Sequence, residues 1–238
     1  MYICKQNLKT MKTFKRGTIL VTMLLMLVSF KVSGQNIQLH YDFNRKCVTS
    51  TVEMFRADKY GNTFFFLDLD FNPRVKGVYG EISREFCFWQ DSKLNWLSLH
   101  VEYNGGMDGG FSFNNNWLGG LTYSGHSNDW SKTWSLSAMY KAIPGNPQVH
   151  NFQLTGVWNL DFFDHWLSFN GFADFWREVN ADTEYTFITE PQLWVNLNKI
   201  KGMEDVNLSV GTEVEMSVNF AGNKGFCTMP TVAVKYAF

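Results

Sequence analysis

The residues that come closest to a catalytic element are His126 and Ser127, within the segment Gly125-His-Ser-Asn-Asp129. A serine nucleophile requires a histidine base within hydrogen-bond reach of its hydroxyl. Adjacent residues of a strand point to opposite faces of the sheet, and the surrounding residues are of turn-forming types. We therefore interpret this segment as a polar turn. The alternative, an outer-membrane enzyme that modifies lipid, depends on these two residues.

Two pairs of carboxylates, Asp68 with Asp70 and Glu213 with Glu215, have the i,i+2 spacing that places both members on one face of a strand, about 6–7 Å apart. Such a pair can bind a cation, but on a water-facing wall solvated charge is the simpler role. The five histidines include no pair at i,i+2 or i,i+4, so a metal site is not indicated. We expect no catalytic residue, no metal and no cofactor.

The first 34 residues have the pattern of a cleaved signal peptide. Basic residues precede the apolar run Thr18–Phe30, and small residues follow at Ser33 and Gly34. A basic region, a short apolar region and small residues at the cleavage site are typical of secretory signals. We expect residues 1–34 to be removed and residues 35–238 to form one mature domain.

The net charge of the whole chain hides an acidic mature domain. The 238 residues contain 21 Lys and Arg against 22 Asp and Glu. Six of the basic residues and none of the acidic ones fall within residues 1–34, so the remainder has 15 basic against 22 acidic side chains, a net charge of −7. This acidity argues against a nucleic-acid partner. Its three cysteines, Cys47, Cys87 and Cys227, allow at most one disulfide, whose pairing stays open.

Apolar residues alternate with polar ones throughout residues 35–238. From Leu97 to Tyr103, for example, Leu97, Leu99, Val101 and Tyr103 alternate with Ser98, His100 and Glu102. Period-two alternation predicts half-buried strands, and clusters of Gly, Asn and Pro separate them. The segments that fit are 36–43, 47–55, 63–71, 78–88, 95–103, 117–124, 133–141, 151–160, 166–176, 185–195, 206–216 and 226–238. We expect an all-β domain, a single antiparallel up-and-down transmembrane β-barrel of about 12 strands.

A membrane barrel explains this pattern better than a soluble one. A closed sheet of this many strands encloses too much volume to be filled with apolar side chains, so its polar face lines water. The chain ends Val232-Ala-Val-Lys-Tyr-Ala-Phe238, and a terminal Phe on an outward-apolar strand is typical of substrates of the barrel-assembly machinery. Aromatic residues near the strand ends fit two membrane-interface girdles: Tyr41, Phe43, Tyr103, Trp117, Trp130, Trp134, Tyr140, Phe152, Trp158, Trp166 and Tyr185.

Strand parity, meaning whether a residue falls on the apolar or the polar face of its strand, also predicts which side chains line the interior. The expected pore-lining and binding residues are Asp68, Asp70, Glu81, Glu85, Trp96, His100, Glu102, Asp174, Trp176, Glu213 and Glu215. Rings beside charged and hydrogen-bonding groups suit a small polar solute with a flat apolar face, and the acidic excess predicts a weak cation preference. The connections expected on the outer side are 104–116, 142–150, 177–184 and 217–225, with 56–62, 89–94, 125–132, 161–165 and 196–205 on the periplasmic side.

Several stretches resemble a known family: Gln35–Phe43, Val101–Gly106, Asn151–Trp158, Phe172–Glu178 and Glu190–Asn198, together with the terminal Phe238. They are similar to a domain-of-unknown-function family of Bacteroides-type outer-membrane barrels, itself distantly similar to the Tsx-type nucleoside-specific channels. The resemblance covers residues 35–238 and implies a monomeric barrel with a narrow pore for nucleosides. No motif aligns the substrate residues of the Tsx-type channels with this chain.

The sequence thus favours an outer-membrane channel for passive diffusion of small polar solutes, with nucleosides suggested by resemblance alone. The expected partners are outer-membrane lipid, the assembly machinery that reads Phe238, and a small-molecule solute. A lipid-modifying enzyme and a closed structural or adhesion barrel remain the alternatives.

Overall fold

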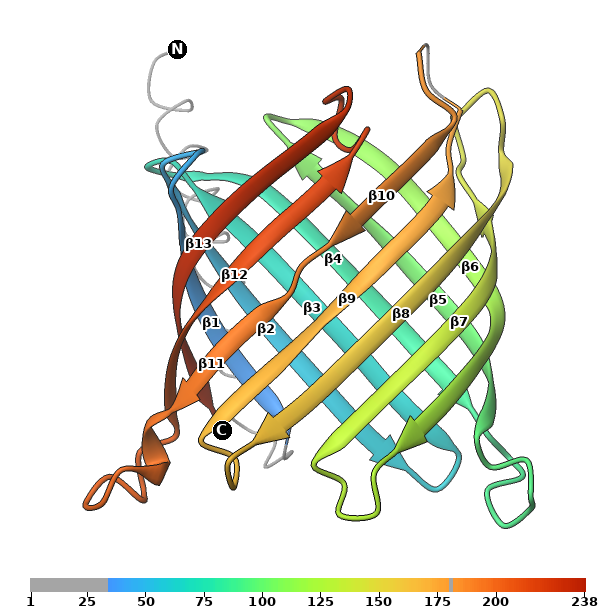
Figure 1. The fold of residues 1–238 in the computed structure, drawn as a ribbon. Coiled ribbons are helices and arrows are strands. Elements are labelled where there is room, and N and C mark those ends of the chain that lie inside the picture. Colours follow the sequence, from blue (N-terminus) through green and yellow to red (C-terminus); the bar gives the residue numbers. More distant parts are fainter. Residues whose placement is uncertain (1–33, 180–181) are drawn as a thin grey trace, which may run out of the picture. The chain divides into compact units, whose positions relative to one another are not determined.

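Each predicted alternation forms an antiparallel strand in the computed structural model, which describes residues 34–179 and 182–238 (Figure 1). The predicted signal peptide, apart from Gly34, lies outside the described residues. The strands are β1 (Gln35–Asp42), β2 (Cys47–Asp58), β3 (Gly61–Phe71), β4 (Val75–Phe86), β5 (Leu97–Asp108), β6 (Phe111–His126), β7 (Lys132–Ala142), β8 (His150–Phe162), β9 (Leu167–Arg177), β10 (Tyr185–Thr189), β11 (Gln192–Asn196), β12 (Leu208–Val218) and β13 (Phe226–Ala237), with one short 3-10 helix, η1 (Leu197–Lys199).

β10 and β11 are the two halves of one interrupted strand. Both pair with β9 on one side and with β12 on the other. The break falls at Glu190-Pro191, because proline has no N–H to donate to a ladder. The parity of the side chains continues across the break, so that Ile188 and Gln192 both face inward. The sheet therefore has twelve strand positions.

The sheet closes on itself. With β10 and β11 counted as one strand, each described strand pairs antiparallel with its neighbours in sequence, and β13 pairs with β1 through partners such as Val234 with Leu39. Closure leaves none of the described strands with an unpaired edge. The predicted fold, an up-and-down antiparallel barrel of about 12 strands, is confirmed.

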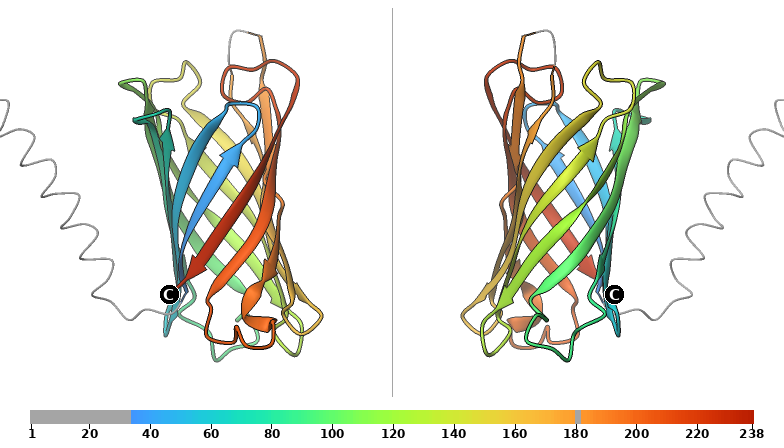
Figure 2. Two further views of the ribbon diagram at one scale, coloured as in Figure 1. Left: turned by 90° about the vertical axis from the view of Figure 1, so that its left-hand side faces the viewer. Right: turned by 90° about the vertical axis from the view of Figure 1, so that its right-hand side faces the viewer.

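The two ends of the barrel differ (Figure 2). At the terminal end, where β1 begins and β13 finishes, the connections are 59–60, 87–96, 127–131, 163–166 and 197–207. At the opposite end, called here the far end, they include 43–46, 72–74, 109–110, 143–149 and 219–225. The longest described connections, 87–96 and 197–207, thus lie at the terminal end, the end to which the periplasmic connections 89–94 and 196–205 are assigned from the sequence.

The expectation of a long outer loop at 104–116 is wrong. β5 continues to Asp108 and β6 begins at Phe111, so only Gly109 and Gly110 connect them. Both glycines have positive φ, 56° and 94°, the backbone that a two-residue hairpin requires at both central positions and that glycine adopts without strain. The turn therefore lets the strands extend well beyond their predicted ends.

The polarity of the barrel is inverted relative to that of a water-soluble domain. Inward side chains such as Gln38 and Asp42 are 1% exposed, whereas the outward Leu136 is 61% exposed and Trp117 is 55% exposed. Water-soluble proteins rarely expose contiguous apolar surfaces of this kind. The apolar face of every strand therefore points outward, as the sequence predicts for a barrel that meets lipid.

Outward aromatic side chains gather near both ends of the strands. Near the far end they are Tyr41, Trp117, Tyr140, Phe152, Phe175 and Tyr185, and near the terminal end they include Tyr123, Trp134, Trp166 and Tyr236. Aliphatic side chains, including Leu39, Val101, Leu121, Leu136 and Leu154, are exposed between the two groups. Two aromatic girdles flanking an aliphatic band are typical of membrane barrels.

Two further observations concern the described part of the chain. None of its helices has the length and hydropathy to cross a membrane. Its cysteines, Cys47, Cys87 and Cys227, are all free.

Candidate functional site: the inner face of the barrel

Strand pairing places all the predicted lining residues except Trp96 on the inner face. These are Asp68, Asp70, Glu81, Glu85, His100, Glu102, Asp174, Trp176, Glu213 and Glu215. Trp96 precedes β5, in the connection 87–96, and its ring lies 5.5 Å from that of Tyr123, an outward side chain of β6. The expectation for Trp96 is wrong because the strand begins one residue later and the ring packs on the outer surface.

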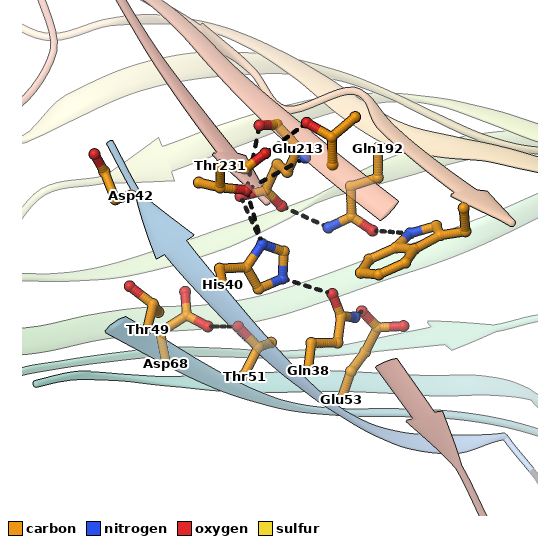
Figure 3. Close-up of polar contacts among 12 residues, drawn as sticks. Gln38, His40, Asp42, Thr49, Thr51, Glu53, Asp68, Gln192, Glu213 and Thr231 are labelled. Carbon is orange, nitrogen blue, oxygen red and sulfur yellow. Dashed lines mark hydrogen bonds and ion pairs between the residues drawn. The ribbon is translucent and has the colours of Figure 1, made fainter. Parts of the chain in front are cut away.

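One network of polar side chains centres on His40 (Figure 3). His40 is 4% exposed. Its Nδ1 lies 3.1 Å from Thr231 Oγ1 and 3.7 Å from Glu213 Oε1, and its Nε2 lies 2.9 Å from Gln38 Oε1. Gln38 in turn donates to Glu53 at 3.3 Å. The network joins β1, β2, β12 and β13, so it ties the closing seam of the barrel together from inside.

Beside this network, threonine hydroxyls of β2 satisfy the carboxylates of β3. Thr51 donates to Asp68 and Thr49 donates to Asp70, each at 2.5 Å. The Arg45 guanidinium, in the connection after β1, lies 3.4 Å from Asp70. The predicted pair Asp68 and Asp70 therefore shares a face, as expected, but each member has its own cross-strand hydroxyl donor.

A second network centres on His100 of β5. His100 Nδ1 lies 2.6 Å from Glu85 Oε1, and its Nε2 lies 3.1 Å from Glu102 Oε2. Glu85 also accepts hydrogen bonds from Ser98 and Thr122. The His100 imidazole therefore links a carboxylate of β4 to one of β5 across the inner face.

Two lysines of the inner face lie over tryptophan rings. Lys141 Nζ is 4.2 Å from the ring centroid of Trp176 and donates to Gln153 Oε1 at 2.7 Å. Lys235 Nζ is 4.3 Å from the ring centroid of Trp194. Cation–π contacts of this kind hold an ammonium group in a partly dry environment.

Acidic side chains outnumber basic ones on the inner face. On the described strands its carboxylates are Asp42, Glu53, Asp68, Asp70, Glu81, Glu85, Glu102, Asp161, Asp174, Glu213 and Glu215, and Glu190 joins them at the strand break. Its lysines on the same strands are Lys141 and Lys235. The interior therefore carries a negative potential, which raises the local concentration of cations.

An apolar plug, formed by Ile143, Phe172, Trp176, Ile188 and Phe220, interrupts this polar interior toward the far end. Ile143 and Phe220 come from the far-end connections, and Ile143 is 0% exposed. The Phe220 ring meets that of Trp176 edge-on at 6.0 Å. Val157, an inner side chain toward the terminal end, is 36% exposed. The apolar plug is therefore confined to the half of the barrel toward the far end.

Sequence reasoning identifies Trp176 as an inner ring, and Phe172 has the same strand parity, but Ile143, Ile188 and Phe220 are not among the expected lining residues. Ile188 has the inward parity of its strand, which is a usable signal. Ile143 and Phe220 lie in connections, where alternation gives no information about direction.

The segment around His126 and Ser127 is a turn, as interpreted from the sequence. The Ser127 hydroxyl donates to Asp129 Oδ1 at 2.5 Å, while His126 Nδ1 lies 2.8 Å from the Ser127 carbonyl oxygen. The His126 ring stacks on that of Trp130, with centroids 3.6 Å apart. The serine hydroxyl is therefore bonded to a carboxylate and not to the imidazole, so the geometry is not that of a nucleophile with its base.

No group of three or more His, Cys, Asp or Glu side chains in residues 34–179 and 182–238 is arranged to hold a metal ion. The inner carboxylates are spread along the wall, each with its own neighbours. The arrangement is suited to weak, distributed interaction with a passing solute rather than to chemistry at one point.

A closed twelve-stranded antiparallel barrel with a charged inner face and an apolar outer face has porin-like architecture. The chain belongs to the DUF5020 family, a domain of unknown function whose family description matches residues 34–238. Membership of a family without an assigned function is thus confirmed. The further likeness to nucleoside-specific channels and the Bacteroides type remain predictions. No curated protein matches the chain.

Two solved structures share the fold. The structure titled "KdgM porin" has a TM-score of 0.52 and 13% sequence identity, and the match covers 86% of this chain and 98% of that chain. The structure titled "NanC porin structure in rhombohedral crystal form" has a TM-score of 0.56 and 6% identity, and the match covers 86% of this chain and 99% of that chain. At these identities the likeness defines a common barrel and no common substrate.

Proposed function

We propose that this protein is an outer-membrane channel through which small polar solutes diffuse without a cofactor. The observation that carries the proposal is the inverted polarity of the closed barrel. Its exposed girdles and aliphatic band match a lipid environment, and its interior offers hydrogen-bonding and charged groups in the side-chain layers outside the apolar plug. The porin titles of the two similar structures are consistent with this function.

The acidic interior supports a preference for cations over anions. Its carboxylates outnumber its lysines and His40 and His100 are bonded to acceptors. Screening by salt weakens such a preference, since the Debye length falls from about 30 Å at 0.01 M to about 10 Å at 0.1 M. We expect the selectivity to be strongest at low salt.

Nucleosides are the proposed solutes, on the resemblance to Tsx-type channels and on the inner rings. Phe64 and Phe66 face inward with ring centroids 6.1 Å apart, and the Phe66 ring lies 5.9 Å from that of Tyr79. A nucleobase can stack on such rings while its edge and ribose bond to carboxylates and amides. A non-specific pore has no need of these rings.

Export and assembly follow from the same proposal. Residues 1–34 serve as the signal peptide, and the strand that ends at Phe238 serves as the recognition signal for the barrel-assembly machinery. Phe238 and Tyr236 are exposed and their rings meet edge-on at 5.3 Å. The mature protein then functions as a monomer embedded in outer-membrane lipid.

Swelling of proteoliposomes in nucleosides and in sugars of similar size tests the channel. We expect faster entry of nucleosides. Equal entry of both overturns the nucleoside preference alone, whereas no entry of either contradicts the channel.

A matched pair of variants tests the role of the rings. Phe66 faces inward and its neighbour Phe65 faces outward on the same strand. Phe66→Leu should slow nucleoside entry while leaving sugar entry unchanged, and Phe65→Leu should affect neither. An equal effect of the two variants would show that the inner ring does not contact the solute.

The apolar plug favours a second candidate, a closed structural or adhesion barrel. The plug fills the interior toward the far end with side chains that have no polar group for a solute. Such a barrel would insert into planar bilayers without conductance, and the Phe220→Ala variant would also show no conductance.

A further inference from the structure

Three asparagines, on β5, β6 and β8, have buried side-chain oxygens that accept no hydrogen bond from any described residue. Oδ1 of Asn104, Asn116 and Asn151 is in this state. Asn104 is 3% exposed and Asn151 is 7% exposed. A buried amide oxygen without a donor is costly, and two of these oxygens belong to direct cross-strand partners, Asn104 and Asn116.

Strand register brings two of these asparagines together with carboxylates. Asn104 is the direct partner of Asn116 on one side and of Glu81 on the other, and all three side chains face inward. The Asn104 amide nitrogen donates to Glu102 Oε1 at 3.0 Å, which orients the free Oδ1 away from that carboxylate. Glu81 accepts a hydrogen bond from the Tyr79 hydroxyl. The wall thus presents acceptors in excess of donors.

Lys141 shows which chemistry this wall accepts. It pairs across the strands with Asn151, and its ammonium contacts an amide oxygen, Gln153 Oε1, at 2.7 Å and the indole face of Trp176. Its charge interacts with those of Asp174 and Glu81. The protein's own lysine therefore already holds a primary alkylammonium group at this wall. The nearby carboxylates outnumber this single ammonium group.

We propose that Asn104 and Asn116, with Glu81 and Glu102, form a binding site for a primary alkylammonium group carried by a small organic cation. Each ammonium supplies three donors, which the free amide oxygens and carboxylates accept. An inorganic metal ion fits less well, because the acidic side chains of the described residues do not converge on one point. This inference deepens the proposed function, since it names a class of solute that the channel retains, and it depends on the inner face being reached from solution.

Calorimetric titration of the detergent-solubilised protein tests the site without requiring conductance. The probe is 1,4-diaminobutane, and 1,4-butanediol, which has the same length and no charge, is the control. We expect heat of binding for the diamine alone. Equal heats for both compounds, or no heat for the diamine, would overturn the site, whereas a lack of ion conductance in bilayers would contradict the channel and leave the titration intact.

Single substitutions test whether the diamine binds at the proposed residues. Asn104→Leu and Glu81→Gln should each weaken diamine binding about tenfold or more, the effect of one lost hydrogen bond to a charged group. The matched control is Glu53→Gln, because Glu53 is an inner glutamate that pairs with Asn36 and Phe66 rather than with Asn104. Migration on gels before and after boiling checks that each variant folds, and Glu81→Gln keeps the shape of the side chain. Unchanged binding in both site variants, or equal loss in the control, would contradict the assignment.

Discussion

The stability change caused by replacing Leu136 with arginine distinguishes a lipid-facing outer surface from a water-facing one. Leu136 is the 61%-exposed outward side chain near the middle of β7 (Lys132–Ala142). In water an exposed Leu→Arg change alters stability by less than about 0.5 kcal/mol. At the centre of a bilayer the same change on the outside of a barrel costs about 2–4 kcal/mol.

The depth of Leu136 follows from the geometry of the strand. At about 3.4 Å per residue, Leu136 lies roughly 14 Å along the strand from Lys132 and roughly 20 Å from Ala142. With a tilt of about 40° these become about 10 and 15 Å along the barrel axis, so their total matches the apolar band of about 25 Å expected for a membrane barrel. Leu136 is therefore close to the bilayer centre, where the larger value applies.

Equilibrium unfolding by urea in lipid vesicles measures the effect. Leu136→Arg should lower the unfolding free energy by about 2–4 kcal/mol. The control is Phe163→Arg, in a terminal-end turn with a 77%-exposed side chain, which should change it by about 0–1 kcal/mol. Equal stability of Leu136→Arg and the wild type would refute the lipid-facing assignment of the outer surface.

Three further predictions concern the interior and the turns. Phe220→Ala removes an edge-on contact of the apolar plug, so single-channel conductance should rise, and unchanged conductance would show that the plug does not limit the pore. Gly211→Ala places a Cβ 2.2 Å from the Leu193 carbonyl oxygen and 2.6 Å from the Trp194 ring, so the unfolding free energy should fall by about 1–3 kcal/mol, and wild-type stability would contradict that packing. Hydrogen bonds from Ser127 and then Ser131 lower the pKa of Asp129 from 3.8 to about 2; the turn keeps these bonds above pH 3.8 and loses them as the pH falls through 2, so an NMR titration midpoint near 3.8 would contradict them.

The strands and the inner face could be predicted because a barrel repeats one rule, an outward apolar residue followed by an inward polar one. Asp68, Glu81 and His100 lie inside for this reason alone. The same alternation continues across the interruption at Glu190-Pro191. The residues of β10 and β11 that face inward keep the same parity on both sides of the break.

The remaining features depend on contacts that alternation does not encode. Asn104 and Asn116 look like loop residues in a Gly- and Asn-rich stretch, yet the turn at Gly109 and Gly110 makes them strand partners. Phe220 belongs to the plug because its connection folds back over Trp176. Such placements follow from tertiary packing, and the local sequence carries no sign of them.

The reversal potential in planar bilayers, across a KCl gradient at low ionic strength, tests the central claim most directly. A conducting barrel lined by excess carboxylates predicts a potential whose sign shows K⁺ permeating faster than Cl⁻, and whose size shrinks as salt is raised. A barrel that inserts without conducting, or one that passes Cl⁻ faster than K⁺, would contradict the account.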